Sequence, residues 1–106
     1  MANFYERQLY TLNTTNLTTV LTINTSSVAI VKTVQASESD NTQVDVDVVV
    51  NSTVISHDTI SKSTVNLITG VLNLQAGDVL KIQADTANKI TGVVSFLRID
   101  RSQENG

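Results

Sequence analysis

The residues that could perform chemistry are few in this chain of 106 residues. It has one His, no Cys and ten carboxylates scattered along its length. Ser56, His57 and Asp58 have the side-chain types of a hydrolase triad, but they are consecutive. Neighbouring side chains of a strand point to opposite faces, whereas a triad is brought together from separate segments. We therefore expect no catalytic site, and we interpret this segment as an edge or a turn with a solvated His.

A second group of candidates is acidic. Asp45 and Asp47 are separated by one residue, which places both carboxylates on one face of a strand, about 6–7 Å apart. Paired carboxylates can serve glycoside hydrolysis, and together with Glu38 and Asp40 they could bind Ca²⁺. The spacing and glycine turn of an EF-hand loop are missing. We favour a solvated outer face, with Ca²⁺ at a subunit contact as the alternative, and predict no metal and no cofactor.

The remaining motifs for ligand binding are weak. The chain has no glycine-rich phosphate loop and no His/Cys cluster for zinc. Tyr5 and Tyr10 could stack on a sugar, but an odd and an even position of one strand face opposite sides. Gly77-Asp78 fits a tight turn, because Gly accepts a positive φ and Asp can bond its own backbone there. A net charge of −3 without a basic patch argues against nucleic-acid binding.

Composition favours a small all-β domain. Val and Thr, with fifteen residues each, branch at Cβ and fit a pleated sheet better than a helix. Aromatic residues make up 4%, so the core has to be built from Val, Ile and Leu, which suits two sheets about 10 Å apart. The sequence contains no run of about 18 apolar residues, so it predicts no membrane-spanning helix. Without Cys, stability has to rest on sheet packing or on oligomerisation.

Apolar residues alternate with a period of two along most of the chain. Val44, Val46 and Val48 alternate with Asp45 and Asp47 in the clearest half-buried strand. The pattern predicts eight strands, over residues 4–12, 17–23, 28–36, 44–50, 53–60, 65–74, 80–84 and 90–99. We expect one domain over residues 1–106, an eight-stranded antiparallel β-sandwich of jelly-roll type, with an immunoglobulin-like sandwich as the alternative. Residues 101–106 are expected to form a flexible tail.

Five side chains are expected in the core, because each lies in the apolar phase of its strand. They are Ile30, Val46, Leu80, Ile82 and Phe96. The most polar stretch of the chain, residues 37–41, is expected to be an exposed loop.

Five segments follow one another along nearly the whole chain. They are Thr14-Thr15 with residues 18–22, residues 29–34, the Val-rich strand 44–50, residues 72–80 with Ala76-Gly77-Asp78, and residues 93–97. Taken in this order, they resemble the segments of small all-β structural proteins of tailed bacteriophages. Members of this group are virion components, either capsid decoration or cement proteins or small tail and fibre subunits. The chain departs from the group at residues 4–8, which are bulkier and more charged.

The resemblance implies a non-enzymatic protein that is made in the host cytoplasm and then located in the virion. It implies the major capsid protein and copies of the chain itself as partners, without nucleic acid or membrane. Binding to the capsid exterior, which it would stabilise, is the leading interpretation; a tail or fibre component and a carbohydrate-binding module are the alternatives. The expected contact residues are Phe4, Tyr5, Arg7, Tyr10, Glu38 and Asp40.

Residues 1–10 are expected to form either an N-terminal arm or a first strand. They carry three of the four aromatic residues, which makes them candidates for binding a neighbouring molecule. If this segment anchors the protein, a chain lacking residues 2–8 is expected to fold but to attach more weakly to the capsid lattice or to its own copies.

Overall fold

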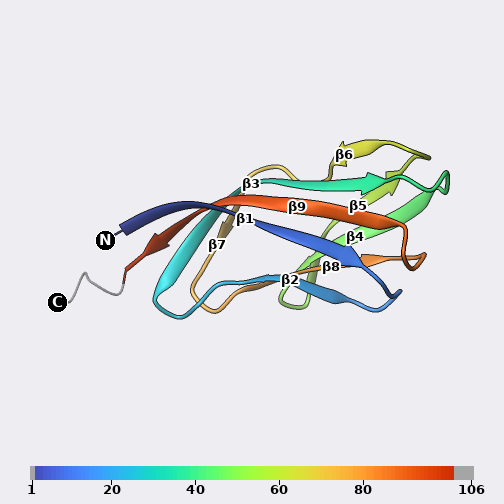
Figure 1. Ribbon diagram of the computed structural model, residues 1–106. Helices are drawn as coiled ribbons and strands as arrows, with labels where there is room; N and C mark the ends of the chain where they lie inside the picture. Colours follow the sequence, from blue (N-terminus) through green and yellow to red (C-terminus); the bar gives the residue numbers. More distant parts are fainter. Residues whose placement is uncertain (1, 102–106) are drawn as a thin grey trace.

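The computed structural model describes residues 2–101, which form two antiparallel sheets packed as a sandwich (Figure 1). This confirms the predicted all-β sandwich. Sheet A has the strand order β1-β9-β3-β6, with β7 also paired to β3, and sheet B has the order β2-β8-β4-β5. None of the described residues forms a helix that could cross a membrane. The strands are β1 (Ala2–Leu12), β2 (Thr18–Thr22), β3 (Ser27–Glu38), β4 (Val44–Val50), β5 (Thr53–Ile60), β6 (Val65–Leu67), β7 (Leu72–Leu74), β8 (Val79–Ala84) and β9 (Ile90–Asp100).

The predicted sixth strand, over residues 65–74, is two short strands. Both β6 and β7 pair with β3, β6 near Ala36 and β7 near Ile30. Between β6 and β7 a backbone hydrogen bond still joins the chain to β3: Ile68 N donates to the carbonyl oxygen of Val34 at 2.8 Å. Counted as one interrupted strand, β6 and β7 leave eight strand positions. Successive strands then alternate between the sheets except at the β4–β5 hairpin, an order compatible with a jelly roll.

A β-bulge in β3 explains the one core residue that was predicted wrongly. The register of β3 against β9 shifts between Val31 and Thr33. Before the bulge Ala29 and Val31 are buried, and after it Val34 is buried. Since a bulge inserts one residue, the side chains beyond it change face. Ile30 therefore lies on the outer face and is half-buried, instead of belonging to the core.

The other four predicted core residues, Val46, Leu80, Ile82 and Phe96, are buried as expected. The core is dominated by aliphatic side chains contributed by both sheets. Its largest fully buried members include Leu12, Ile23, Ile60, Leu74 and Ile90.

The turn between β7 and β8 has the predicted form. Gly77 has φ of +83°, and Gln75 N donates to Oδ2 of Asp78 at 2.8 Å. The side-chain amide of Asn51 donates to Oδ1 of Asp78 at 3.1 Å, and Val79 N donates back to Asn51 at 3.0 Å. The Asn51 amide, and then the Gln75 N–H, lower the pKa of the Asp78 carboxyl. These bonds connect the β4–β5 turn to the start of β8.

The N-terminal segment is the first strand of sheet A and not an arm. β1 pairs with β9 from Ala2 opposite Asp100 to Leu12 opposite Ile90, without a register shift. The N-terminal end of β1 and the C-terminal end of β9 lie together at one end of the elongated molecule (Figure 1). A chain lacking residues 2–8 would lose most of an edge strand, so surface substitutions are the sharper test. Of the predicted tail, residues 102–106 lie outside the described residues.

Candidate functional site

The surface best suited to contact another molecule is the outer face of sheet A. Residues directly opposite each other in an antiparallel pair share a face. Val34 and Val94 are opposite each other and fully buried, so their neighbours along each strand face outward. Two rows of large side chains cross this outer face from β1 through β9 to β3, namely Tyr5–Leu97–Ile30 and Leu9–Val93–Gln35.

Two side chains of β1 project furthest from this face. Tyr5 is 83% exposed and Leu9 is 61% exposed, while Leu97 and Ile30 beside Tyr5 are half-buried. The solvated face of an antiparallel sheet normally carries polar side chains. Apolar rows on such a face are typical of a surface that binds another molecule.

The same face carries positive side chains without negative ones. Arg7 lies between the two rows, opposite Ser95, and Lys32 is exposed at the bulge of β3. With Tyr5 they line a shallow hollow of about 440 Å³, and Glu6, which is paired with Arg98, also belongs to its lining. Within residues 2–101, the carboxylates of β1, β3 and β9 occupy inner-face positions, at Glu6, Glu38 and Asp100. The outer face of sheet A is therefore suited to an acidic and partly apolar partner.

Phe4 belongs to the other side of β1 and is also accessible. The Arg98 guanidinium lies 4.5 Å from the centroid of the Phe4 ring, and Arg98 Nε donates to Glu6 Oε1 at 2.6 Å. Phe4 is nevertheless 41% exposed, and the side chains of residues 3–9 are exposed on both faces of the strand. Sheet B therefore leaves this half of β1 uncovered.

Tyr10 is part of the core, although it was expected at a contact surface. The side chain is buried, and its hydroxyl donates to the carbonyl oxygen of Gln35 at 2.7 Å, across Gly92. Burial raises the pKa of Tyr10 well above its ordinary value. The physical reason is that the C-terminal half of β1 packs inside the sandwich, where Leu12 is fully buried as well.

Glu38 also has a structural place, and residues 37 and 38 belong to β3 instead of an exposed loop. The side chain is 1% exposed, and its carboxylate accepts N–H bonds from Asp40 at 2.7 Å and Ser63 at 2.8 Å. Burial alone would raise the pKa of this carboxyl, but the N–H groups of Ser63, Asp40 and Thr42 lower it below the ordinary value of 4.5. Glu38 thus joins the β3–β4 and β5–β6 connections, although it was expected at a contact with a partner.

We expect Glu38 to make stability depend on pH. Since its pKa is lower in the folded than in the unfolded chain, the ionised carboxylate stabilises the fold above the ordinary carboxyl range. This stabilisation is lost as the pH falls through the lowered pKa. Glu38→Gln should reduce the melting temperature at pH 7 and flatten its decline between about pH 5 and pH 3. Thermal unfolding followed by circular dichroism checks this, with the exposed Ser39→Ala as control, and a decline as steep as in the parent chain would contradict it.

Asp40 remains accessible at the surface. It forms an ion pair with Lys89, which joins the β3–β4 connection to the β8–β9 connection. An exposed pair of this kind contributes about 0–1 kcal/mol to stability. Its expected role at a contact stays a prediction.

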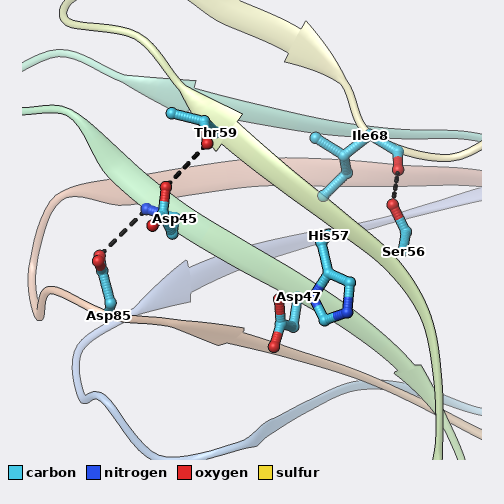
Figure 2. A network of polar contacts seen from close by, with 7 residues as sticks. All are labelled: Asp45, Asp47, Ser56, His57, Thr59, Ile68 and Asp85. Atoms are coloured by element: carbon cyan, nitrogen blue, oxygen red, sulfur yellow. Dashed lines mark hydrogen bonds and ion pairs between the residues drawn. The ribbon is translucent and has the colours of Figure 1, made fainter.

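The side chains of Ser56, His57 and Asp58 do not converge. Ser56 Oγ donates to the carbonyl oxygen of Ile68 at 2.9 Å, whereas His57 Nδ1 lies 2.6 Å from Oδ1 of Asp47 on the neighbouring strand (Figure 2). Asp58 lies opposite the buried Val46 and so follows the inner phase of β5. The three side chains alternate across β5, as predicted from their consecutive positions.

Asp45, Asp47 and Asp85 make one end of the outer face of sheet B acidic. Asp45 accepts a bond from the hydroxyl of Thr59 at 2.9 Å, and Asp45 N donates to Asp85 at 3.1 Å (Figure 2). Asp45 and Asp47 therefore lie on the outer face, as predicted. Among the residues that the structure describes, no group of three or more His, Cys, Asp or Glu side chains could hold a metal ion.

A second hollow, uncharged and of mixed polarity, lies at the opposite edge of the sandwich. This hollow of about 450 Å³ lies between β5 and the segment from β6 to β7, and Ile55, Leu67 and Leu72 are among its apolar lining residues. None of its lining residues is charged. It therefore gives no indication of the charge of a partner.

Leu9, Lys32 and Leu97 belong to the outer face of sheet A but were not predicted as candidate contact residues. A signal was present for Leu9, because it shares the odd phase of its strand with Tyr5 and Arg7. Lys32 and Leu97 come from other strands. Their place beside Tyr5 follows from the pairing register, which local alternation does not contain.

No protein-family model matches this chain, and no curated protein matches it in sequence.

Proposed function

We propose that this protein is a non-enzymatic structural protein of a phage virion, which binds the capsid exterior and stabilises it. Two lines of reasoning support the proposal. One is the resemblance, in order, of the segments described above to small virion proteins. The other, on which the proposal depends most, is the outer face of sheet A, with its large apolar side chains and its two cations, Arg7 and Lys32, beside which the carboxylate in the hollow, Glu6, is already paired with Arg98.

The outer face of sheet A would bind an acidic, partly apolar surface of the major capsid protein. Tyr5 and Leu9 would lose their contact with water, which is favourable by about 25 cal/mol for each Å² of apolar surface. Arg7 and Lys32 would pair with carboxylates of the capsid. A copy that contacts two neighbouring capsid subunits stabilises the assembled state by linkage. The stabilisation is about 2.7 kcal/mol when the free concentration of the protein is one hundred times the dissociation constant.

The alternatives differ in how they would use this surface. A tail or fibre component would use the same face on another part of the particle. A carbohydrate-binding module has weaker support, because Tyr10 is buried and Tyr5 is the single exposed ring on this face of the described residues. The experiment below therefore tests binding to the capsid exterior.

Binding to purified heads that lack the protein tests this proposal. We expect the chain to co-sediment with such heads to saturation and to raise the temperature at which they open. A variant carrying both Arg7→Ser and Lys32→Ser should bind about tenfold more weakly, because each exposed ion pair contributes up to about 1 kcal/mol.

The matched control carries Thr19→Ser and Gln83→Ser, two exposed positions on the outer face of sheet B, and should bind as the parent chain does. Binding to purified tails and not to heads would replace the capsid with the tail. Binding to neither, with retention on immobilised glycans, would contradict a structural role and favour the carbohydrate-binding module.

A further inference from the structure

β1 presents a long edge that natural sheets usually protect. It pairs with β9 on one side, and within residues 2–101 no strand pairs with its other side. The strand is 11 residues long, contains neither Pro nor Lys, and pairs with β9 without a bulge. Short length, Pro, charged side chains (above all Lys) and bulges are the features that keep edge strands from adding another strand. β1 has two charged side chains, Glu6 and Arg7, of which Glu6 is paired with Arg98, and it has none of the other features.

The accessible side chains of β1 add to this observation. Asn3 to Leu9 are all exposed, on both faces of the strand, and they include three of the large apolar residues that the fold leaves exposed, Phe4, Tyr5 and Leu9. Glu6 is already paired with Arg98. Among the described residues of β1, Arg7 is therefore the one charged side chain that a partner strand would find without an ion pair.

We propose that β1 pairs antiparallel with β1 of a second copy, about a twofold axis at Gln8. The two copies of sheet A would then form one continuous sheet. This contact concerns the edge of sheet A, not its outer face, and it does not depend on capsid binding.

Face and charge together select the register. Residues opposite each other share a face, and a twofold axis perpendicular to the sheet leaves every side chain on its own face. Each residue therefore pairs with a residue of the same phase, which requires the axis to pass through a residue and not between two residues. An axis at Glu6 or at Arg7 would place like charges opposite each other, which is destabilising. An axis at Gln8 avoids this. The overlap then runs from Phe4 to Leu12 on both strands, longer than in any other register without opposed like charges.

The contacts in this register suit the side chains involved. Arg7 lies opposite Leu9 of the second copy, where its aliphatic stem can cover the exposed Leu9 side chain. Phe4 lies opposite Leu12 of the second copy. The half of β1 that sheet B leaves uncovered is thus placed beside the half that packs inside the other sandwich.

Two substitutions of Leu9 separate this pairing from a general loss of apolar contact. Leu9→Lys places a cation opposite Arg7 of the second copy at two sites related by the axis, whereas Leu9→Glu places a carboxylate there. We expect the parent chain to be a dimer in analytical ultracentrifugation. The dissociation constant of Leu9→Lys should be at least about tenfold higher than that of Leu9→Glu. Since Leu9 is largely exposed, both variants should fold, which circular dichroism checks.

Single cysteines report the register directly, because the chain has no Cys of its own. Gln8→Cys places two thiols at the axis, where opposite Cβ atoms are about 4.5–5.5 Å apart, and mild oxidation should give a covalent dimer. Thr11→Cys, on the same strand, should remain uncrosslinked because its two copies lie far apart. A monomeric parent chain, equal dissociation constants for the two Leu9 variants, or equal crosslinking of both Cys variants would overturn this contact. A monomer that still binds heads would overturn it and leave the proposed function intact.

Discussion

Replacing Gly92 with Ala is expected to lower the free energy of unfolding by about 3 kcal/mol or more. A Cβ at this position would lie 2.5 Å from Cζ of Tyr10 and closer still to the carbonyl oxygen of Gln35. Relief requires either a shift of β3 or expulsion of the Tyr10 ring, with loss of its hydrogen bond to Gln35. Overpacking costs about 1–3 kcal/mol, and an unsatisfied buried polar group costs a similar amount. Urea unfolding measures the difference.

Gly70→Ala is the matched control, because a Cβ there has no neighbouring atom within 4 Å and should change stability by less than about 0.5 kcal/mol. Tyr10→Leu added to Gly92→Ala should recover only part of the loss, since it removes the ring but leaves the Gln35 carbonyl in place. A loss below about 0.5 kcal/mol for Gly92→Ala alone would show that β3 and Tyr10 yield easily.

Ile82→Ala should destabilise the protein by about 2–5 kcal/mol. Ile82 is fully buried on β8, opposite Val48 of β4, near the middle of sheet B. Truncation removes apolar atoms and leaves a cavity, because the β-sandwich around the site relaxes only in part. Equilibrium unfolding in urea or guanidinium measures the loss.

Two further truncations calibrate this result. Ile30→Ala should cost less, because the bulge in β3 places Ile30 on the half-exposed outer face. Leu67→Ala, at a side chain that is 66% exposed, should change stability little. If Ile82→Ala cost no more than Leu67→Ala, the inward phase of β8 would be wrong.

The sandwich and most strand boundaries could be predicted from residue types. Val44, Val46 and Val48 alternate with polar residues, and β4 follows this alternation up to Val48, after which its register against β5 shifts. Gly77 allowed the turn before β8 to be placed for the same local reason. The division of residues 65–74 could not be predicted, because it depends on how β6 and β7 meet β3 and not on their own alternation.

The accessibility of the candidate contact residues was predicted less well than the fold. Phe4, Tyr5 and Arg7 are accessible because sheet B leaves this half of β1 uncovered, and their role at a contact stays a prediction. Tyr10 and Glu38 were chosen for their residue types, and both are buried. An aromatic ring and a carboxylate can serve the fold as readily as a surface, and residue type alone does not separate the two roles.

A β-sandwich with an aliphatic core can be predicted from local sequence alone, because alternation and turn residues act over a few neighbouring positions. Three long-range relations are visible only in the folded chain: Tyr10 lies across Gly92, Glu38 binds the backbone of Ser63, and Lys32 joins Tyr5 and Arg7 on one face. These relations join residues that are far apart in the chain. A single inserted residue, such as the bulge in β3, changes the face of the residues that follow it, so strand register has to be known before any of these relations can be stated.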